Sequence, residues 1–150
     1  MKIMLLINGG ANILNNRIEL INKCIISGLE VAIVCPFDED TKKIIDLGIQ
    51  CIHVDLNRRS TNPFQDFKLY RQYKKILKKE KPEIVLTYTI KPNIYGGLAA
   101  KKLKIPYIAN ITGLGTAVEN EGLLQKFILF LYKLSFKNIN TVFFQNQTNM

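Results

Sequence analysis

Short apolar runs alternate with amphipathic segments along the whole chain, about every 25 residues, and this alternation is the strongest constraint on its fold. The runs are rich in Val, Ile and Leu, which is typical of strands buried on both faces of a parallel sheet. Strands are expected at residues 2–7, 31–35, 49–54, 83–88, 105–110 and 141–145. The sequence therefore predicts an α/β fold, a Rossmann-like, doubly wound and mostly parallel sheet with helices on both faces.

The segments between these runs carry residues that begin and end helices. Gly28 and Gly48 stand where glycine commonly ends a helix, and Asp38 and Asp40 stand where carboxylates favour the positive end of a helix dipole. Longer helices are expected at about residues 64–79, 93–102 and 121–137. In the first of these, an apolar stripe is separate from most of the lysines: Leu69, Tyr70, Tyr73, Ile76 and Leu77 against Lys74, Lys75, Lys78 and Lys79.

Composition and single residues disfavour several classes of protein. With 150 residues, 47% hydrophobic and 22% charged, the chain has the profile of one soluble globular domain. No signal peptide and no run of about 18 apolar residues is visible, so a cytoplasmic location is expected. Cys24, Cys35 and Cys51 match no metal or disulfide pattern and are expected to be reduced core residues. His53 is the only histidine, which argues against a His-based metal site or catalytic triad and favours a structural role at a strand end.

The net charge of +9 comes from one segment. Residues 68–104 hold eleven Lys or Arg against two Glu, while positive and negative residues cancel in the rest of the chain. Such a segment attracts phosphorylated ligands, anionic lipid or nucleic acid, and a solvated helix face is the plainer alternative. Tyrosines are interleaved with the basic residues, but two of them belong to the apolar stripe, so RNA binding is a minor option.

Three loops fall at the expected carboxyl edge of the sheet, where ligands bind in open parallel sheets. In residues 8–12, Gly9 and Gly10 let backbone N–H groups approach an oxyanion, although a simple tight turn explains them equally well. The pattern is not GxGxxG, so dinucleotide binding is poorly supported.

The second loop, residues 88–93, places Lys91 at a strand end, where it can reach a phosphate as a point charge. Asn93 could instead only cap the next helix. In the third loop, residues 110–115, Asn110 and Thr112 suit sugar hydroxyls and Gly113 allows a close approach to the backbone. A flexible connection is the alternative there.

The stretches KPEIVLTYTIKPNIYG, IPYIANITGLG and TVFFQN together resemble the N-terminal domain of family-4 glycosyltransferases. The likeness extends over nearly all of the chain. It is greatest to bacterial enzymes that extend undecaprenyl-diphosphate-linked sugars for capsule, lipopolysaccharide O-antigen or glycoprotein glycans.

The resemblance implies the N-terminal half of a GT-B fold, with transfer of a hexosyl or N-acetylhexosaminyl group from a nucleotide-diphosphate sugar to a polyprenyl-diphosphate-linked acceptor, and without a metal or other cofactor. The family's positions map onto two groups of residues. Gly9, Gly10 and Arg17 would face the donor diphosphate, and Lys91, Asn93, Asn110, Thr112 and Gly113 would line the acceptor side.

By the same resemblance, residues 1–150 form the acceptor-side domain, and the donor-binding C-terminal domain is absent from the chain. That domain would be supplied in cis or in trans, and the isolated chain is not expected to turn over. The basic helix and the oily helix at residues 123–136 would suit peripheral docking on the anionic inner face of the cell membrane, with no nucleic-acid partner. Two alternatives stay open: a non-catalytic docking or scaffold subunit, and a stand-alone nucleotide-binding α/β protein.

Overall fold

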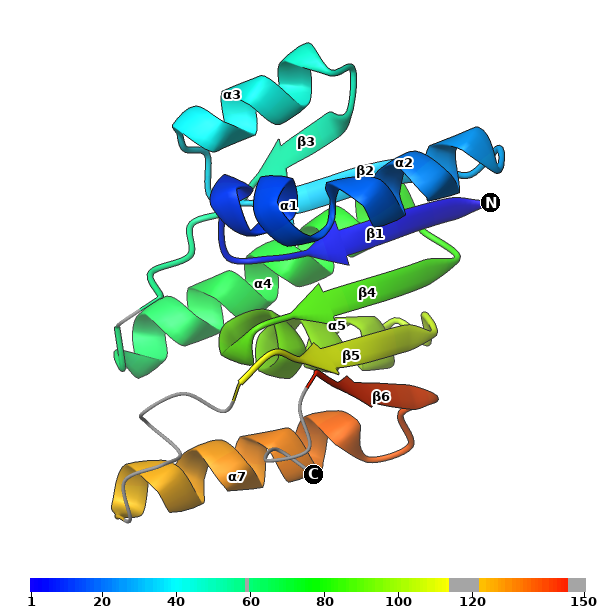
Figure 1. Ribbon diagram of the computed structural model, residues 1–150. Coiled ribbons are helices and arrows are strands. Elements are labelled where there is room, and N and C mark those ends of the chain that lie inside the picture. Colours follow the sequence, from blue (N-terminus) through cyan, green and yellow to red (C-terminus); the bar gives the residue numbers. More distant parts are fainter. Residues whose placement is uncertain (59, 114–121, 146–150) are drawn as a thin grey trace.

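The computed structural model describes residues 1–58, 60–113 and 122–145 of the chain. Six strands form one sheet: β1 (Lys2–Leu6), β2 (Glu30–Cys35), β3 (Gln50–His53), β4 (Ile84–Tyr88), β5 (Tyr107–Ile111) and β6 (Thr141–Phe144). Their order is β3-β2-β1-β4-β5-β6, and every neighbouring pair of these strands is parallel (Figure 1). The predicted Rossmann-like, doubly wound sheet is therefore confirmed.

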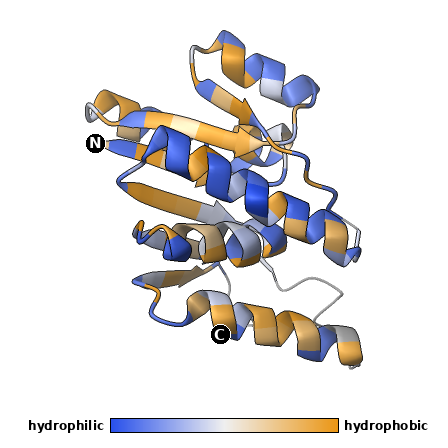
Figure 2. Cartoon of the chain, turned by 180° about the vertical axis from the view of Figure 1, so that it is seen from behind, coloured by the Kyte–Doolittle hydropathy of each residue, from blue (hydrophilic) through white to orange (hydrophobic). Residues whose placement is uncertain are grey.

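Helices cover both faces of the sheet. On one face lie α1 (Gly10–Asn16), α2 (Ile18–Ile26) and α3 (Glu39–Asp46), and behind the sheet lie α4 (Pro63–Glu80) and α5 (Gly97–Lys102) (Figure 1). The π-helical turn η1 (Pro92–Gly96) leads into α5, and α7 (Leu123–Phe136) packs on both of them. Figure 2 shows the side formed by α4 and α7.

The two hydrophobic cores follow from the two-residue period of the strands. In β1, Met4 and Leu6 join the core under α4 and α5, whereas Ile3 and Leu5 join the core under α1, α2 and α3. Both sets are buried, because helices cover both faces. The apolar stripe of α4 is confirmed, since Leu69, Tyr73 and Leu77 are each at most 2% exposed.

Two helices, α2 and α3, have ends at the capping residues that the sequence predicted. Gly28 and Gly48 have φ of 79° and 81°, a backbone conformation that favours glycine, and each follows the end of a helix. Asp38 caps α3 by accepting a hydrogen bond from the Thr41 backbone, and Asn62 caps α4 by accepting one from Phe64. Asp38 was expected at this helix start, while α4 begins one residue earlier than predicted, with Pro63 in its first turn.

Several expectations need correction. Helix α1 (Gly10–Asn16) begins inside the glycine turn that was expected at residues 8–12. Asn93 does not cap a helix, because it lies inside η1 with its side chain turned to β5. Cys35 is buried, but Cys24 and Cys51 are only partly buried, and all three are free thiols. His53 ends β3, as expected.

No helix in the described ranges is long and apolar enough to cross a membrane.

We expect Leu77→Ala to lower the free energy of unfolding by about 2–5 kcal/mol, because the buried side chain leaves a cavity in the α4 core. The matched change Leu47→Ala should cost less than about 0.5 kcal/mol, because Leu47 is 63% exposed. Urea denaturation of both variants measures the difference, and equal losses would contradict the placement of α4 over the sheet.

Candidate functional site

The candidate site is the carboxyl edge of the sheet, where the loops that follow β1, β4 and β5 leave side by side. The strand order places β1 between β2 and β4, so the winding of the chain reverses between β1 and β4. A crevice at such a reversal is the usual ligand position in open α/β sheets. The structure thus brings together the three loops singled out in the sequence, two of them directly at the reversal.

The glycine loop packs against the start of α3. The Gly10 N–H donates a hydrogen bond of 3.0 Å to Asp38 Oδ2. A Cβ added at Gly10 would lie 2.5 Å from both Asp38 Oδ1 and the Thr41 nitrogen. Gly10 is therefore required by the close approach of two helix starts, and its N–H is engaged within the protein.

Asp38 is the anion that this loop binds within the chain. Burial alone would raise the pKa of its carboxyl group, but hydrogen bonds from the Thr41 side chain and from the Gly10 and Thr41 N–H groups outweigh burial and hold the pKa below its ordinary value. The contribution of Asp38 to stability is present at neutral pH and is lost as the pH falls through this lowered pKa.

Arg17 lies at the junction of α1 and α2, next to the end of β4. Its guanidinium sits 4.7 Å from the centre of the Tyr88 ring and donates a 2.7 Å hydrogen bond to the Asn16 carbonyl. A cation over an aromatic face is held electrostatically. None of the ion pairs found among the described residues includes Arg17, so its charge is not neutralised by a carboxylate there.

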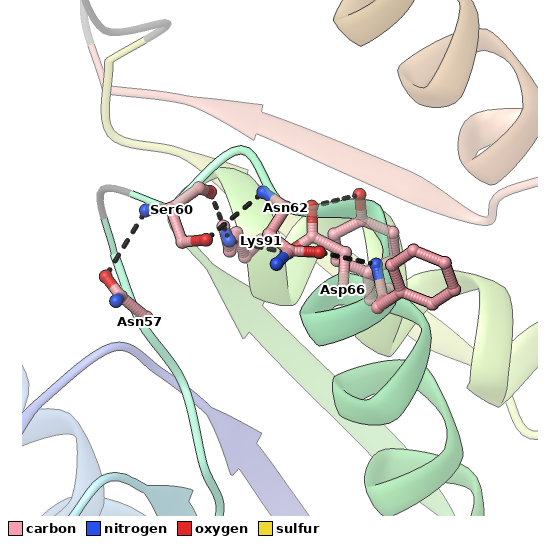
Figure 3. A network of polar contacts seen from close by, with 7 residues as sticks. Asn57, Ser60, Asn62, Asp66 and Lys91 are labelled. Atoms are coloured by element: carbon pink, nitrogen blue, oxygen red, sulfur yellow. Dashed lines mark hydrogen bonds and ion pairs between the residues drawn. The ribbon is translucent and has the colours of Figure 1, made fainter.

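Lys91 is the centre of a polar network at the reversal point (Figure 3). Its Nζ donates to Asp66 Oδ1 at 2.5 Å and to the Ser60 carbonyl at 2.7 Å. The hydroxyl of Tyr95 donates to the other oxygen of Asp66 at 2.9 Å. The side chains of Lys91 and Asp66 are only 13% and 14% exposed, so the pair is largely withdrawn from water. Burial, together with the Asp66 charge, raises the pKa of Tyr95 well above its usual value.

The same network fixes the loop between β3 and α4. The Ser60 N–H donates to Asn57 Oδ1, and the Asn62 N–H donates to Ser60 Oγ (Figure 3). Lys91 therefore connects η1 to the start of α4 through side-chain and backbone groups together. Two of its three ammonium protons are engaged by these contacts, which leaves one donor direction for a ligand.

Thr89 connects β4 to η1 in a conformation that is unfavourable for its residue type. Its φ is 71°, in the left-handed region that β-branched residues rarely adopt. Such strain costs about 1–3 kcal/mol and is found mainly at functional sites. The strain falls two residues from Lys91, at the reversal point.

Asn93 and Asn110 lie together, but largely inside the protein. Asn93 is 1% exposed, and its Nδ2 donates to the Asn110 carbonyl at 3.0 Å. Ser135 of α7 donates to the Asn93 carbonyl at 2.8 Å, and Asn110 Nδ2 donates to the Thr87 carbonyl at 3.3 Å. The Asn93 amide thus joins η1 to β5, the Asn110 amide joins β5 to β4, and Ser135 joins α7 to η1. Contact of either asparagine with an acceptor stays a prediction.

Thr112 and Gly113 follow β5 at the same edge and are partly exposed. A Cβ at Gly113 would meet nothing within 4 Å, so the backbone there is open to an approaching group. Residues 114–117 of the predicted loop lie outside the described residues. Lys91, Asn93 and Asn110 each make hydrogen bonds within the protein. Among the described residues of the predicted acceptor side, Thr112 and Gly113 have no such bond to account for their position.

Two cavities with polar side chains in their walls lie along the rim between the glycine loop and Lys91, and we call them the polar cavities. One, of about 400 Å³, is lined by Lys91, Asp66 and His53 among others, and the other, of about 640 Å³, by Asn8 and Asp38. Pro36, Leu56 and Asn57 line both, so the two are neighbours. They offer amide and charged groups of the kind that bind sugars. Within the described ranges, no cluster of His, Cys, Asp or Glu is arranged to hold a metal ion.

Sequence reasoning missed the two carboxylates that partner the predicted binding groups. Asp38 was seen only as a helix start, and Asp66 was not singled out. A signal for Asp38 was present in the D-x-x-T spacing of a capping box. No local pattern could have linked Asp66 to Lys91, because the pair is 25 residues apart and is formed by the fold.

Comparison with known proteins places these features in a family. The family model described as "Glycosyl transferase 4-like" matches residues 2–146. A Campylobacter jejuni protein named N,N'-diacetylbacillosaminyl-diphospho-undecaprenol alpha-1,3-N-acetylgalactosaminyltransferase is 36% identical over 154 residues, which cover 99% of this chain. The chain spans only 41% of the length of that relative.

Solved structures show the same fold at low sequence identity. UDP-GlcNAc 2-epimerase from Methanocaldococcus jannaschii aligns with a TM-score of 0.68 at 19% identity, over 98% of this chain and 40% of the epimerase chain. MurG from Acinetobacter baumannii aligns with a TM-score of 0.65 at 16% identity, over 94% of this chain and 40% of its own. The fold therefore corresponds to the N-terminal half of GT-B proteins, as predicted.

We expect Gly10→Ala to lower the free energy of unfolding by about 1–3 kcal/mol, because its Cβ would meet backbone atoms at the start of α3. Gly122→Ala is the matched control, since a Cβ there meets nothing within 4 Å. Thermal or urea unfolding compares them. A tolerated Gly10→Ala would remove the packing explanation for this glycine.

We expect Asp66→Ala to cost about 3 kcal/mol in unfolding free energy, because it leaves the buried Lys91 charge without its carboxylate. Asp55→Ala is the control: Asp55 also pairs with a lysine, but at an exposed position, and its loss should cost less than about 1 kcal/mol. The double change Lys91→Met with Asp66→Leu should recover most of the loss, because no charge is then left buried. If Asp66→Ala is as mild as Asp55→Ala, the network does not hold the rim together.

Proposed function

We propose, from the premise that this chain belongs to the glycosyl transferase 4-like family, that it is the acceptor-side half of a glycosyltransferase. The reaction would move a sugar from a nucleotide-diphosphate donor to a sugar carried on a polyprenyl diphosphate. The single observation that carries this proposal is the 36% identity to the Campylobacter jejuni transferase across almost the whole chain. N-acetylgalactosamine is accordingly the first sugar to test.

The positions of the cations at the rim support this chemistry. Negative charge develops on the leaving diphosphate during sugar transfer, so fixed cations and N–H donors lower the barrier. Arg17 lies on the β1 side of the reversal point without a carboxylate partner among the described residues, and we assign it, with the Gly9–Gly10 loop, to the donor diphosphate. Lys91 lies on the β4 side, and we assign its remaining donor to the diphosphate of the acceptor.

The remaining assignments divide between contact and positioning. Thr112 and Gly113 would contact the acceptor sugar, because their side-chain and backbone groups lie at the open part of the rim. Asn93 and Asn110 would act mainly by fixing η1 and β5 beneath it, because their amide nitrogens donate hydrogen bonds inside the protein. The polar cavities between the glycine loop and Lys91 have the volume and the hydrogen-bonding groups for one or two sugar rings.

A second domain belongs to this proposal. Residues 1–150 would form one wall of the cleft, and a donor-binding domain, in the same chain or in another, would form the second wall. The chain's span of 41% of its relative supports this division. Transfer without a metal is also proposed, on the family resemblance alone, and unchanged activity in excess EDTA would support it.

We further propose a peripheral position at the cytoplasmic face of the membrane, in the synthesis of capsule, lipopolysaccharide or a related glycan. Two features support it. The segment of residues 68–104 carries the whole net positive charge, and α7 exposes Phe127, Phe130 and Leu134. Basic residues beside exposed apolar side chains favour binding to anionic bilayers. Vesicle flotation with and without anionic lipid tests it.

We expect Lys91→Met to lower kcat/KM for transfer to a polyprenyl-diphosphate-linked sugar by about 10²–10³-fold, because a charged donor to the diphosphate is lost. The assay uses UDP-N-acetylgalactosamine and supplies the C-terminal domain in cis or in trans. Lys42→Met, at an exposed position on α3, is the control and should leave kcat/KM unchanged. Circular dichroism separates loss of function from loss of fold, and normal transfer by folded Lys91→Met would contradict the assignment.

A further inference from the structure

A cavity of a different kind lies beside the rim, and none of the groups in the proposed reaction has been assigned to it. It measures about 630 Å³ and runs between α4, α5 and α7. Most of its wall is apolar, formed by Phe67 and Tyr70 of α4, Leu98 of α5, and Phe127, Leu131 and Leu134 of α7. Figure 2 looks at this side of the molecule, where the α7 ribbon is largely hydrophobic. We call this cavity the apolar groove.

The apolar groove begins at the Lys91 network. Asp66 lines both the apolar groove and the polar cavity that contains Lys91. Tyr95, which donates to Asp66, lines the groove, and Thr61 and Pro63 at the start of α4 lie at the same end. The apolar groove therefore lies next to the Lys91 ammonium group, with Asp66 between them.

The rim of the groove has a matching charge. Lys101, Lys102 and Lys104 line it at the α5 side and make that side of the channel positive, while the charge of Lys91 is paired with Asp66. An apolar channel with cations at its edge is complementary to a molecule that joins a hydrocarbon chain to an anionic head. An uncharged apolar partner would gain nothing from these lysines.

We infer that the apolar groove holds the first isoprenoid units of the acceptor lipid, with its diphosphate at Lys91. This inference rests on the proposed function, in which the acceptor is a sugar carried on a polyprenyl diphosphate. The groove recognises the lipid part of the acceptor, while the polar cavities face its sugar. The bound lipid would then orient the sugar at the rim, so that the protein would recognise both the lipid and the sugar of the acceptor.

The test measures binding of isoprenyl diphosphates of increasing length to the 150-residue chain by calorimetry. The probes are inorganic diphosphate, geranyl diphosphate and farnesyl diphosphate. Each methylene buried in the groove should tighten binding about fourfold, so farnesyl diphosphate should bind at least tenfold more tightly than geranyl diphosphate, and inorganic diphosphate the least. Equal affinity for all three probes would overturn the inference.

Two matched pairs of variants locate the binding. Phe127 lines the groove and Phe130, on the same helix and similarly exposed at 60% against 53%, does not. Phe67 lines the groove and Phe64, on the same face of α4, does not. Phe127→Ser and Phe67→Ser should each weaken farnesyl diphosphate about tenfold and remove the dependence on chain length, while Phe130→Ser and Phe64→Ser should change neither.

Other occupants of the groove give different results. Equal weakening by all four variants would indicate a general membrane-facing surface and would overturn the inference. Loss of farnesyl diphosphate binding on addition of the C-terminal domain would mean that this domain covers the groove, and would also overturn it. The proposed function fails separately: length-dependent binding, with no sugar transfer even when the C-terminal domain is supplied, would refute the transfer reaction and leave the groove. Transfer that ignores chain length and the Phe127 change would refute the groove and leave the reaction.

Discussion

Parallel pairing of all six described strands is the constraint on which the remaining features depend. Parallel strands need a crossover between each pair, so a helix covers each face of the sheet and both faces of the strands become apolar. The same pairing makes every strand end at one edge. Loops far apart in the sequence, such as those at Gly10 and Gly113, thereby lie along a single rim. The position of the site follows from the hydrogen-bond pattern of the backbone before any side chain is considered.

Carboxylates of the protein itself engage the groups that would bind an anionic ligand. Asp38 accepts the Gly10 N–H, and Asp66 accepts a proton of Lys91. A buried ammonium group without such a partner would be strongly destabilising, so folding requires the acid. The arrangement also fixes Lys91 in one direction, which would lower the cost of ordering it in the proposed contact with a diphosphate. The pair therefore stabilises the fold at the proposed binding position, and the strained backbone at Thr89 lies beside it.

The surface next to this network changes from polar to apolar over a very short distance. Asp66 belongs to both regions, with its ion pair toward the rim and its tyrosine partner toward the groove between α4 and α7. A lipid-linked sugar has the same sequence of chemistry along its length: sugar, diphosphate, hydrocarbon. Lys101, Lys102 and Lys104 line the apolar groove, whereas the basic residues of α4 line a neighbouring cavity.

The sequence by itself determined the fold class, the positions of the six strands and most helix ends, because these depend on local periodicity and on capping residues such as Asp38 and Gly48. It also determined which loops lie at the carboxyl edge of the sheet. Tertiary structure alone decided that Gly10 is needed for packing, that Asn93 is buried, and that Lys91 is paired with Asp66. These facts depend on distances between segments far apart in the chain, and no local pattern encodes them. The apolar groove was also decided by the structure, because it exists only where the side chains of three separate helices meet.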